Sequence, residues 1–146
     1  MTQNNLSDAL KQLLADSYIL MLKTQNYHWN VQGGNFHSLH EMFEEQYTDL
    51  WGAVDEIAER IRAIGSDAPG TFQQFQKLSS INSEHILTES KHMLSSLIEE
   101  NKNVVLTAKL VVKSAQKIKD DASTDLAIGR IHVHEKNIWM MQSTLS

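Results

Sequence analysis

One stretch of the sequence carries histidine and carboxylate side chains at helical spacing. His40 and Glu44 are one helical turn apart, and so are Asp55 and Glu59. Side chains four positions apart share a face of a helix, so each pair can hold a metal ion or form a salt bridge. Imidazole and carboxylate groups together make a mixed nitrogen and oxygen environment, which suits Fe(II) and also accepts Zn(II) or Mn(II).

The two pairs cannot bind the same ion within one chain. Glu44 and Asp55 lie about 16 Å apart along a helix, whereas the ligands of one metal ion lie within a few Å of each other. However, positions 40 and 59 have the same midpoint as positions 44 and 55. Two copies of this helix crossing antiparallel about a two-fold axis at that midpoint would therefore form two equivalent sites. Gly52 and Ala53, next to the midpoint, are small enough for a close approach.

A second histidine can join each half-site. His28 lies five residues before Gly33, and His40 lies five residues after Asn35. In an antiparallel helical hairpin, both are about 7 to 8 Å along their helices from the turn, so their imidazoles can face each other. We therefore expect a half-site in one chain that a second copy completes, with the ligands His28, His40, Glu44, Asp55 and Glu59. Taken singly, each of these residues is more typical of a solvated helix face or a helix cap than of a metal ligand.

Composition restricts the classes of protein that need to be considered. The chain has 146 residues, a formal net charge of −5, one Pro and no Cys. The missing Cys excludes a disulfide framework, thiolate metal ligands and a cysteine nucleophile. No apolar run approaches the roughly 20 residues that span a bilayer, and the first residues lack the features of a signal peptide. We expect one soluble, cytoplasmic domain over residues 1–146.

Hydrophobic residues recur every three or four positions along most of the chain, which predicts helices. Gly and Pro cluster in two places and mark a tight turn and a longer connection. The expected long helices cover residues 6–32, the segment from Asn35 to Gly65, residues 89–119, and a segment that starts at Ser123 or Thr124. A short helix is expected around residues 72–78. These elements predict an all-α four-helix bundle in up-down-up-down order, with the short helix in the connection between helices two and three.

Three segments resemble the Dps family of mini-ferritins. The first two are specific: His28-Trp29-Asn30-Val31 with Leu39-His40-Glu41-Met42, and the run from Val54 to Gly65 followed by Pro69-Gly70-Thr71. The third, His134-Glu135-Lys136 with Trp139-Met140, is weaker and fits the last helix of the family. The resemblance extends over nearly the whole chain.

The resemblance implies a ferritin-like subunit that assembles into a hollow dodecamer with ferroxidase sites across its two-fold interfaces. By position, the family's ligands correspond to His28, His40, Asp55 and Glu59. Glu44 stands where many members have Asp, which leaves open whether one or two metal ions bind at each site. Trp29 matches a Trp near the iron site of the family, and an interface anchor is an equally good interpretation.

The implied reaction is the oxidation of Fe(II) to Fe(III) by hydrogen peroxide or O2, followed by storage of ferric mineral. Family shells also have acidic pores at three-fold axes, and the candidates here are Asp120, Asp121 and Asp125. These carboxylates would equally stabilise the N-terminus of a helix without any pore.

Three alternatives remain. A ferritin that builds its site within one bundle needs two Glu-x-x-His motifs, and only Glu89 with His92 fits. A DNA-binding protein would use positive charge, but residues 1–10 contain no Lys or Arg. Lysines do line one helix, at Lys102, Lys109, Lys113 and Lys117. With a net negative chain we expect weak or absent DNA binding. A purely structural helical oligomer would leave the oxidation of Fe(II) unchanged.

Overall fold

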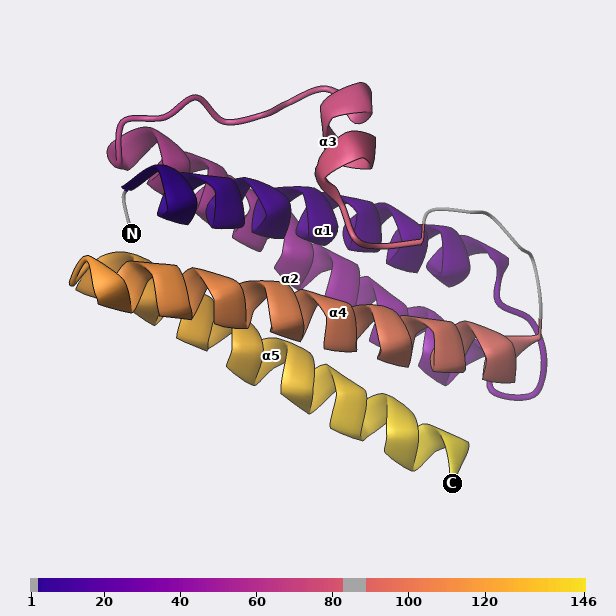
Figure 1. Ribbon diagram of the computed structural model, residues 1–146. Coiled ribbons are helices and arrows are strands. Elements are labelled where there is room, and N and C mark those ends of the chain that lie inside the picture. Colours follow the sequence, from indigo (N-terminus) through magenta and orange to yellow (C-terminus); the bar gives the residue numbers. More distant parts are fainter. Residues whose placement is uncertain (1–2, 83–88) are drawn as a thin grey trace.

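The computed structural model describes residues 3–82 and 89–146, and within these ranges all regular structure is helical. The helices are α1 (Gln3–Asn30), α2 (Phe36–Ala63), α3 (Phe72–Leu78), α4 (Ser90–Lys117) and α5 (Asp121–Leu145). The prediction of an all-α bundle with a short helix between the second and third long helices is confirmed (Figure 1). No helix in the described ranges has the length and apolar character needed to cross a membrane.

The order of helix directions differs from the prediction. The connection after α2 returns along the length of the bundle, with α3 lying across α1, so that α4 runs parallel to α2 (Figure 1). Asp16 of α1 contacts Thr107 of α4, and further along α1 Lys23 contacts Glu100. These contacts show that α1 and α4 are antiparallel. The order is therefore up-down-down-up, because the expected longer connection crosses the length of the bundle and does not reverse the chain direction.

A glycine with positive φ lies in the turn on each side of α2. Gly33, in the turn before the helix, has φ of 116°, and Gly65, just after it, has φ of 94°. Both values lie where a side chain would be strained. The amide of Ser66 donates to the carbonyl of Ile61, which closes the helix in a Schellman-type cap. Asn35 occupies the predicted N-cap position, but its side chain makes no capping bond.

The last long helix begins earlier than predicted. Asp120 is the N-cap of α5, and its carboxylate accepts a hydrogen bond from the backbone amide of Ser123. Aspartate is as good an N-cap as Ser or Thr, the residue types at which the helix was expected to start. The first turn of α5 therefore includes Asp121.

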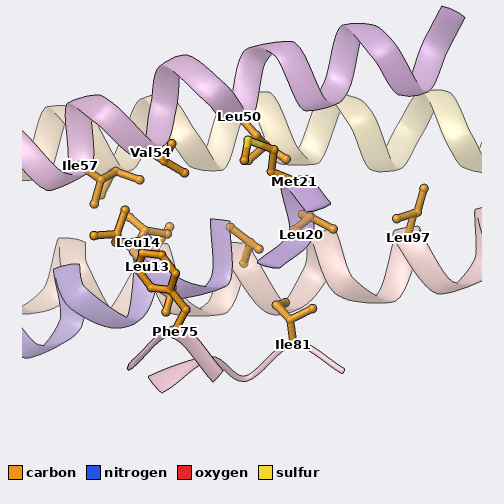
Figure 2. Close-up of a cluster of buried hydrophobic side chains, with 14 of the residues drawn as sticks. Leu13, Leu14, Leu20, Met21, Leu50, Val54, Ile57, Phe75, Ile81 and Leu97 are labelled. Carbon is orange, nitrogen blue, oxygen red and sulfur yellow. The ribbon is translucent and has the colours of Figure 1, made fainter. Parts of the chain in front are cut away.

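The core lies between α1, α2, α4 and α5, and the short helix α3 adds Phe75 to it. Figure 2 shows the part where side chains of α1, α2, α3 and α4 meet, which includes Leu13, Leu14, Leu50, Ile57, Phe75 and Leu97. Most residues of the predicted apolar seams are buried. Leu22 is an exception, because its exposed fraction is 49%. The seam of α2 therefore faces inward, and its polar residues at positions 44, 55 and 59 are left exposed.

Candidate metal centre

Two imidazoles meet at the α1–α2 hairpin, as the spacing from the turn predicted. The rings of His28 and His40 stack with centroids 3.7 Å apart and planes inclined by 15°. Nδ1 of His28 lies 2.7 Å from the backbone oxygen of His40, and Nδ1 of His40 lies 2.7 Å from the backbone oxygen of His28. The two residues thus bond to each other reciprocally.

These bonds determine which nitrogen carries the proton. A carbonyl oxygen only accepts hydrogen bonds, so Nδ1 of each ring must donate. In the neutral imidazole, Nε2 then keeps its lone pair and can bind a metal ion. A hydrogen bond from the other ring nitrogen to a backbone carbonyl is the usual support of a metal-binding histidine. The chain therefore presents two neighbouring imidazoles with the tautomer that metal binding needs.

The surroundings hold this pair in place. His28 is buried in the last turn of α1, whereas His40 is half-buried near the start of α2. The ring of Tyr47 packs edge-on against His28 at 5.1 Å, and Phe36 stacks on His40 at 5.0 Å. These aromatic contacts restrict the rotation of both imidazoles. The sequence motifs did not single out Tyr47, although it follows His40 by two helical turns.

Asp55 and Glu59 form a second polar pair on an exposed face of α2. A hydrogen bond with Asp55 raises the pKa of Glu59 above its ordinary value, and the negative charge of Asp55 adds to this effect. Two carboxyl groups this close cannot both ionise freely unless a proton or a cation lies between them. The pair is therefore a suitable half-site for a cation.

The histidine pair and the carboxylate pair do not meet within one chain. Positions 40 and 59 are about 28 Å apart along α2. In the described ranges, no three His, Asp or Glu side chains gather closely enough to hold a metal ion. Glu44 is exposed one turn from His40. The structure thus brings His28 together with His40 and Asp55 together with Glu59, and it leaves the five predicted ligands as two half-sites.

Exposed aromatic residues lie close to both half-sites. Trp29, next to His28, is 60% exposed, and Trp51 of α2 is 66% exposed. Trp51 and Asp55 line a cavity of about 470 Å³ with Gly52 and Phe75. Large apolar side chains exposed beside a polar site mark a surface that another molecule covers.

The three predicted pore residues have different environments. Asp120 accepts hydrogen bonds from Ser123 and from Arg60, and its side chain is only 13% exposed. Burial alone would raise the pKa of Asp120, but the bonds from Ser123 and the Arg60 guanidinium outweigh burial and lower it. Asp121 and Asp125 are exposed on the first turns of α5. A pore at these residues stays a prediction.

Sequence reasoning missed a buried polar network between α2, α4 and α5. His134 contacts Asn101 through Nδ1 at 2.7 Å and Arg130 through Nε2 at 3.1 Å. Arg130 also forms an ion pair with Asp49 at 2.8 Å. The spacing of Arg130 and His134, one turn apart on one helix, was the available signal.

Comparison with known proteins gives the family. The family model of the ferritin-like domain matches residues 7–146. DNA protection during starvation protein 2 of Bacillus anthracis is 33% identical over 139 residues, and the match covers 95% of each chain. The chain belongs to the Dps family.

Two solved Dps structures support this assignment. Dps from Staphylococcus aureus has a TM-score of 0.96 and 32% identity, covering 99% of this chain and 97% of its own. The Dps protein of Vibrio cholerae O1 has a TM-score of 0.94 and 29% identity, covering 99% of this chain and 91% of its own. The Vibrio cholerae protein is described as a member of a broad superfamily of ferritin-like diiron-carboxylate proteins.

Proposed function

We propose that this Dps-family protein is a ferroxidase that stores iron. Its substrate is Fe(II), which it binds at sites shared by two copies of the chain and oxidises to Fe(III), preferably with hydrogen peroxide. The observation that carries the proposal is the reciprocally bonded pair of His28 and His40, which leaves two Nε2 atoms available. The carboxylates of Asp55 and Glu59 would complete each site from the second copy.

The two-fold arrangement follows from positions along α2. If two α2 helices cross antiparallel about the midpoint of positions 44 and 55, position 40 of one copy lies opposite position 59 of the other. Each histidine pair then meets a carboxylate pair, and Glu44 approaches Asp55. The exposed Trp51 and its neighbouring cavity belong to the same surface. Burial of this apolar surface would stabilise the pairing of the copies.

The donor atoms fit Fe(II). Two neutral imidazoles with several carboxylates form the mixed environment that divalent iron accepts, and the negative charge favours Fe(III) over Fe(II). Two Fe(II) ions reduce one hydrogen peroxide with two protons, which yields two Fe(III) ions and two water molecules. The residues would position the metal and supply a negative electrostatic field, while the metal and peroxide supply the redox chemistry. Removing both reagents together limits the formation of hydroxyl radicals.

The same proposal includes assembly and location. We infer a hollow homo-oligomer, a dodecamer, that holds the ferric mineral inside and works in the cytoplasm. Iron would enter through acidic pores near Asp121 and Asp125. The exposure of these two residues and the net charge of −5 support this route.

DNA protection by direct binding is the alternative that the structure supports less. Four lysines of α4 are exposed and lie along one helix. Lys102, at one end of this stripe, pairs with Glu99 at 3.0 Å. This pairing and the net negative charge reduce the positive potential that would release counterions from DNA.

The test uses two complementary double variants. Anaerobic titration with Fe(II), followed by addition of hydrogen peroxide, compares the wild type with His28→Ala/His40→Ala and Asp55→Ala/Glu59→Ala. Each variant alone should lose binding and oxidation, because every shared site then lacks one half. Glu41→Ala, on an exposed residue of α2, is the matched control and should behave as the wild type.

Mixing the two double variants distinguishes a shared site from a site within one chain. In a one-to-one mixture about half of the two-fold interfaces are mixed, and each mixed interface regains one of its two sites. About one quarter of the activity should therefore return. If subunit exchange is demonstrated and no activity returns, the shared site is wrong.

A further inference from the structure

A partly buried ion pair begins one residue after the carboxylate half-site. Arg60 follows Glu59 on α2, and its Nη2 donates to Oδ1 and Oδ2 of Asp120 at 3.0 and 3.1 Å. Nε of Arg60 donates to the hydroxyl of Ser123 at 2.9 Å, and that hydroxyl donates to Oδ2 of Asp120 at 2.6 Å. The end of α2 that carries the carboxylates is thereby joined to the first turn of α5.

The position of Arg60 poses an electrostatic problem for the site. A positive charge one residue from Glu59 repels a divalent cation that binds Asp55 and Glu59. Water screens this charge less than it screens a fully exposed one, because the side chain of Arg60 is only 27% exposed. By contrast, Arg62 on the same helix is 62% exposed and pairs with the fully solvated Asp67. Arg60 therefore depends on a protein carboxylate for its neutralisation.

We propose that Asp120 neutralises Arg60 and so preserves the attraction of the Asp55–Glu59 pair for Fe(II). Asp120 acts through Arg60 and does not touch the metal, so it is a positioning residue. This role rests on the proposed function, because it concerns the affinity of the same site. It also gives the predicted pore residue Asp120 a separate task, in which its carboxylate faces Arg60 inside the subunit.

A cycle of four proteins separates charge from structure: the wild type, Asp120→Asn, Arg60→Gln and the double variant. Asn caps a helix about as well as Asp, so Asp120→Asn can keep the hydrogen bond from the Ser123 amide. The readout is the dissociation constant of Fe(II) in anaerobic titration. A titration with Co(II) in place of Fe(II), without hydrogen peroxide, measures binding with no oxidation of the metal.

The charge role predicts a specific pattern. Asp120→Asn leaves Arg60 unpaired and should weaken the binding of both ions about three- to tenfold. Arg60→Gln removes the positive charge and should bind as tightly as the wild type or more tightly. The double variant removes both charges and should return to within about twofold of the wild type. Raised salt should reduce the defect of Asp120→Asn, because it screens the released charge.

Glu99→Gln is the matched control. It makes the same acid-to-amide change and releases Lys102, but it lies on α4, which packs against α1 and α5. The binding of Fe(II) should not change in this variant. Circular dichroism on every variant checks that the helices form.

Each failure has its own signature. If the wild type binds no Fe(II), the proposed function fails. If the wild type binds Fe(II) and Asp120→Asn binds equally well, the role of Asp120 is wrong. If Arg60→Gln or the double variant is folded but as weak as Asp120→Asn, the pair is only structural and the charge role is again wrong.

Discussion

At the scale of residues, hydrogen-bond partners separate the histidines into two groups. His28 and His40 use Nδ1 on backbone carbonyls and keep Nε2 available. His134 uses both nitrogens, because Nδ1 faces the Asn101 amide oxygen and Nε2 accepts from Arg130. His134 is completely buried. It therefore stabilises the packing of α4 and α5 and has no lone pair left for a metal.

The burial of His134 predicts how stability depends on pH. Desolvation, and then the positive charge of Arg130, lower the pKa of His134 from 6.5 to about 3. Below pH 6.5 the unfolded chain binds a proton at His134 that the folded chain does not bind. The free energy of unfolding should therefore fall as the pH decreases from 6.5 towards 3, and His134 should contribute no such change above 6.5. Urea unfolding at several pH values and one fixed protein concentration measures this effect.

His134→Gln isolates this contribution, because glutamine does not titrate. The stability of this variant should fall less steeply with decreasing pH than that of the wild type. His37→Gln is the control, since the side chain of His37 is 83% exposed. Its pH dependence should match the wild type. Equal slopes for wild type and His134→Gln would show that His134 is not held neutral in the folded protein.

At the scale of elements, hydrophobic spacing predicted the helices well and their directions badly. The apolar seam of α2 is a local pattern of residue spacing, and most of it, including Phe43 and Ile57, is buried. Direction depends on a connection whose path no local pattern specifies. The antiparallel packing of α1 and α4 is visible only in long-range contacts such as Asp16 with Thr107. The spacing of residues in the sequence does not distinguish a buried carboxylate such as that of Asp16 from one on the surface.

Substitution of Asp16 should strongly destabilise the protein, because Asp16 holds the connection that follows α3. Its carboxylate is completely buried and accepts hydrogen bonds from Ser79, from both the amide and the hydroxyl of Ser80, and from Thr107. Asp16→Ala leaves these donors without their acceptor, and each buried unsatisfied group costs about 1 to 3 kcal/mol. Because hydroxyls can turn to other partners, we expect the free energy of unfolding to fall by about 3 kcal/mol.

Urea unfolding measures the effect, and Asp8→Ala is the matched control. Asp8 lies on the same helix and is exposed, so its loss should change stability by less than about 0.5 kcal/mol. Asp16→Asn keeps one acceptor oxygen and should fall between the two. A loss for Asp16→Ala no larger than that of Asp8→Ala would mean that the network does not stabilise the fold.

At the scale of the whole molecule, the single chain carries the two halves of the proposed site and exposed apolar side chains around them. The sequence could indicate both halves, because shared midpoints along one helix are a property of residue numbers alone. It could also predict that His28 faces His40, from their equal distances to the turn. It could not show how two copies would meet, since the proposed contact depends on the shape of a surface to which α1, α2 and α3 contribute. The small residues near the midpoint offer a direct test of this meeting.

Gly52 gives the last prediction, which concerns the crossing of two α2 helices. Glycine inside a helix costs about 1 kcal/mol relative to alanine, and beyond the adjoining backbone of α2 a Cβ atom at Gly52 would meet nothing within 4 Å. Gly52→Leu should therefore leave the helices of one subunit intact. If two copies approach each other at this point, the new side chain separates them, and both assembly and Fe(II) binding are lost.

Sedimentation velocity measures assembly of the Gly52→Leu protein, circular dichroism measures its helix content, and Fe(II) titration measures metal binding. Gln116→Leu, an exposed position on α4, controls for the added leucine and should retain all three. A Gly52→Leu protein that assembles and binds Fe(II) like the wild type would show that the helices cross elsewhere.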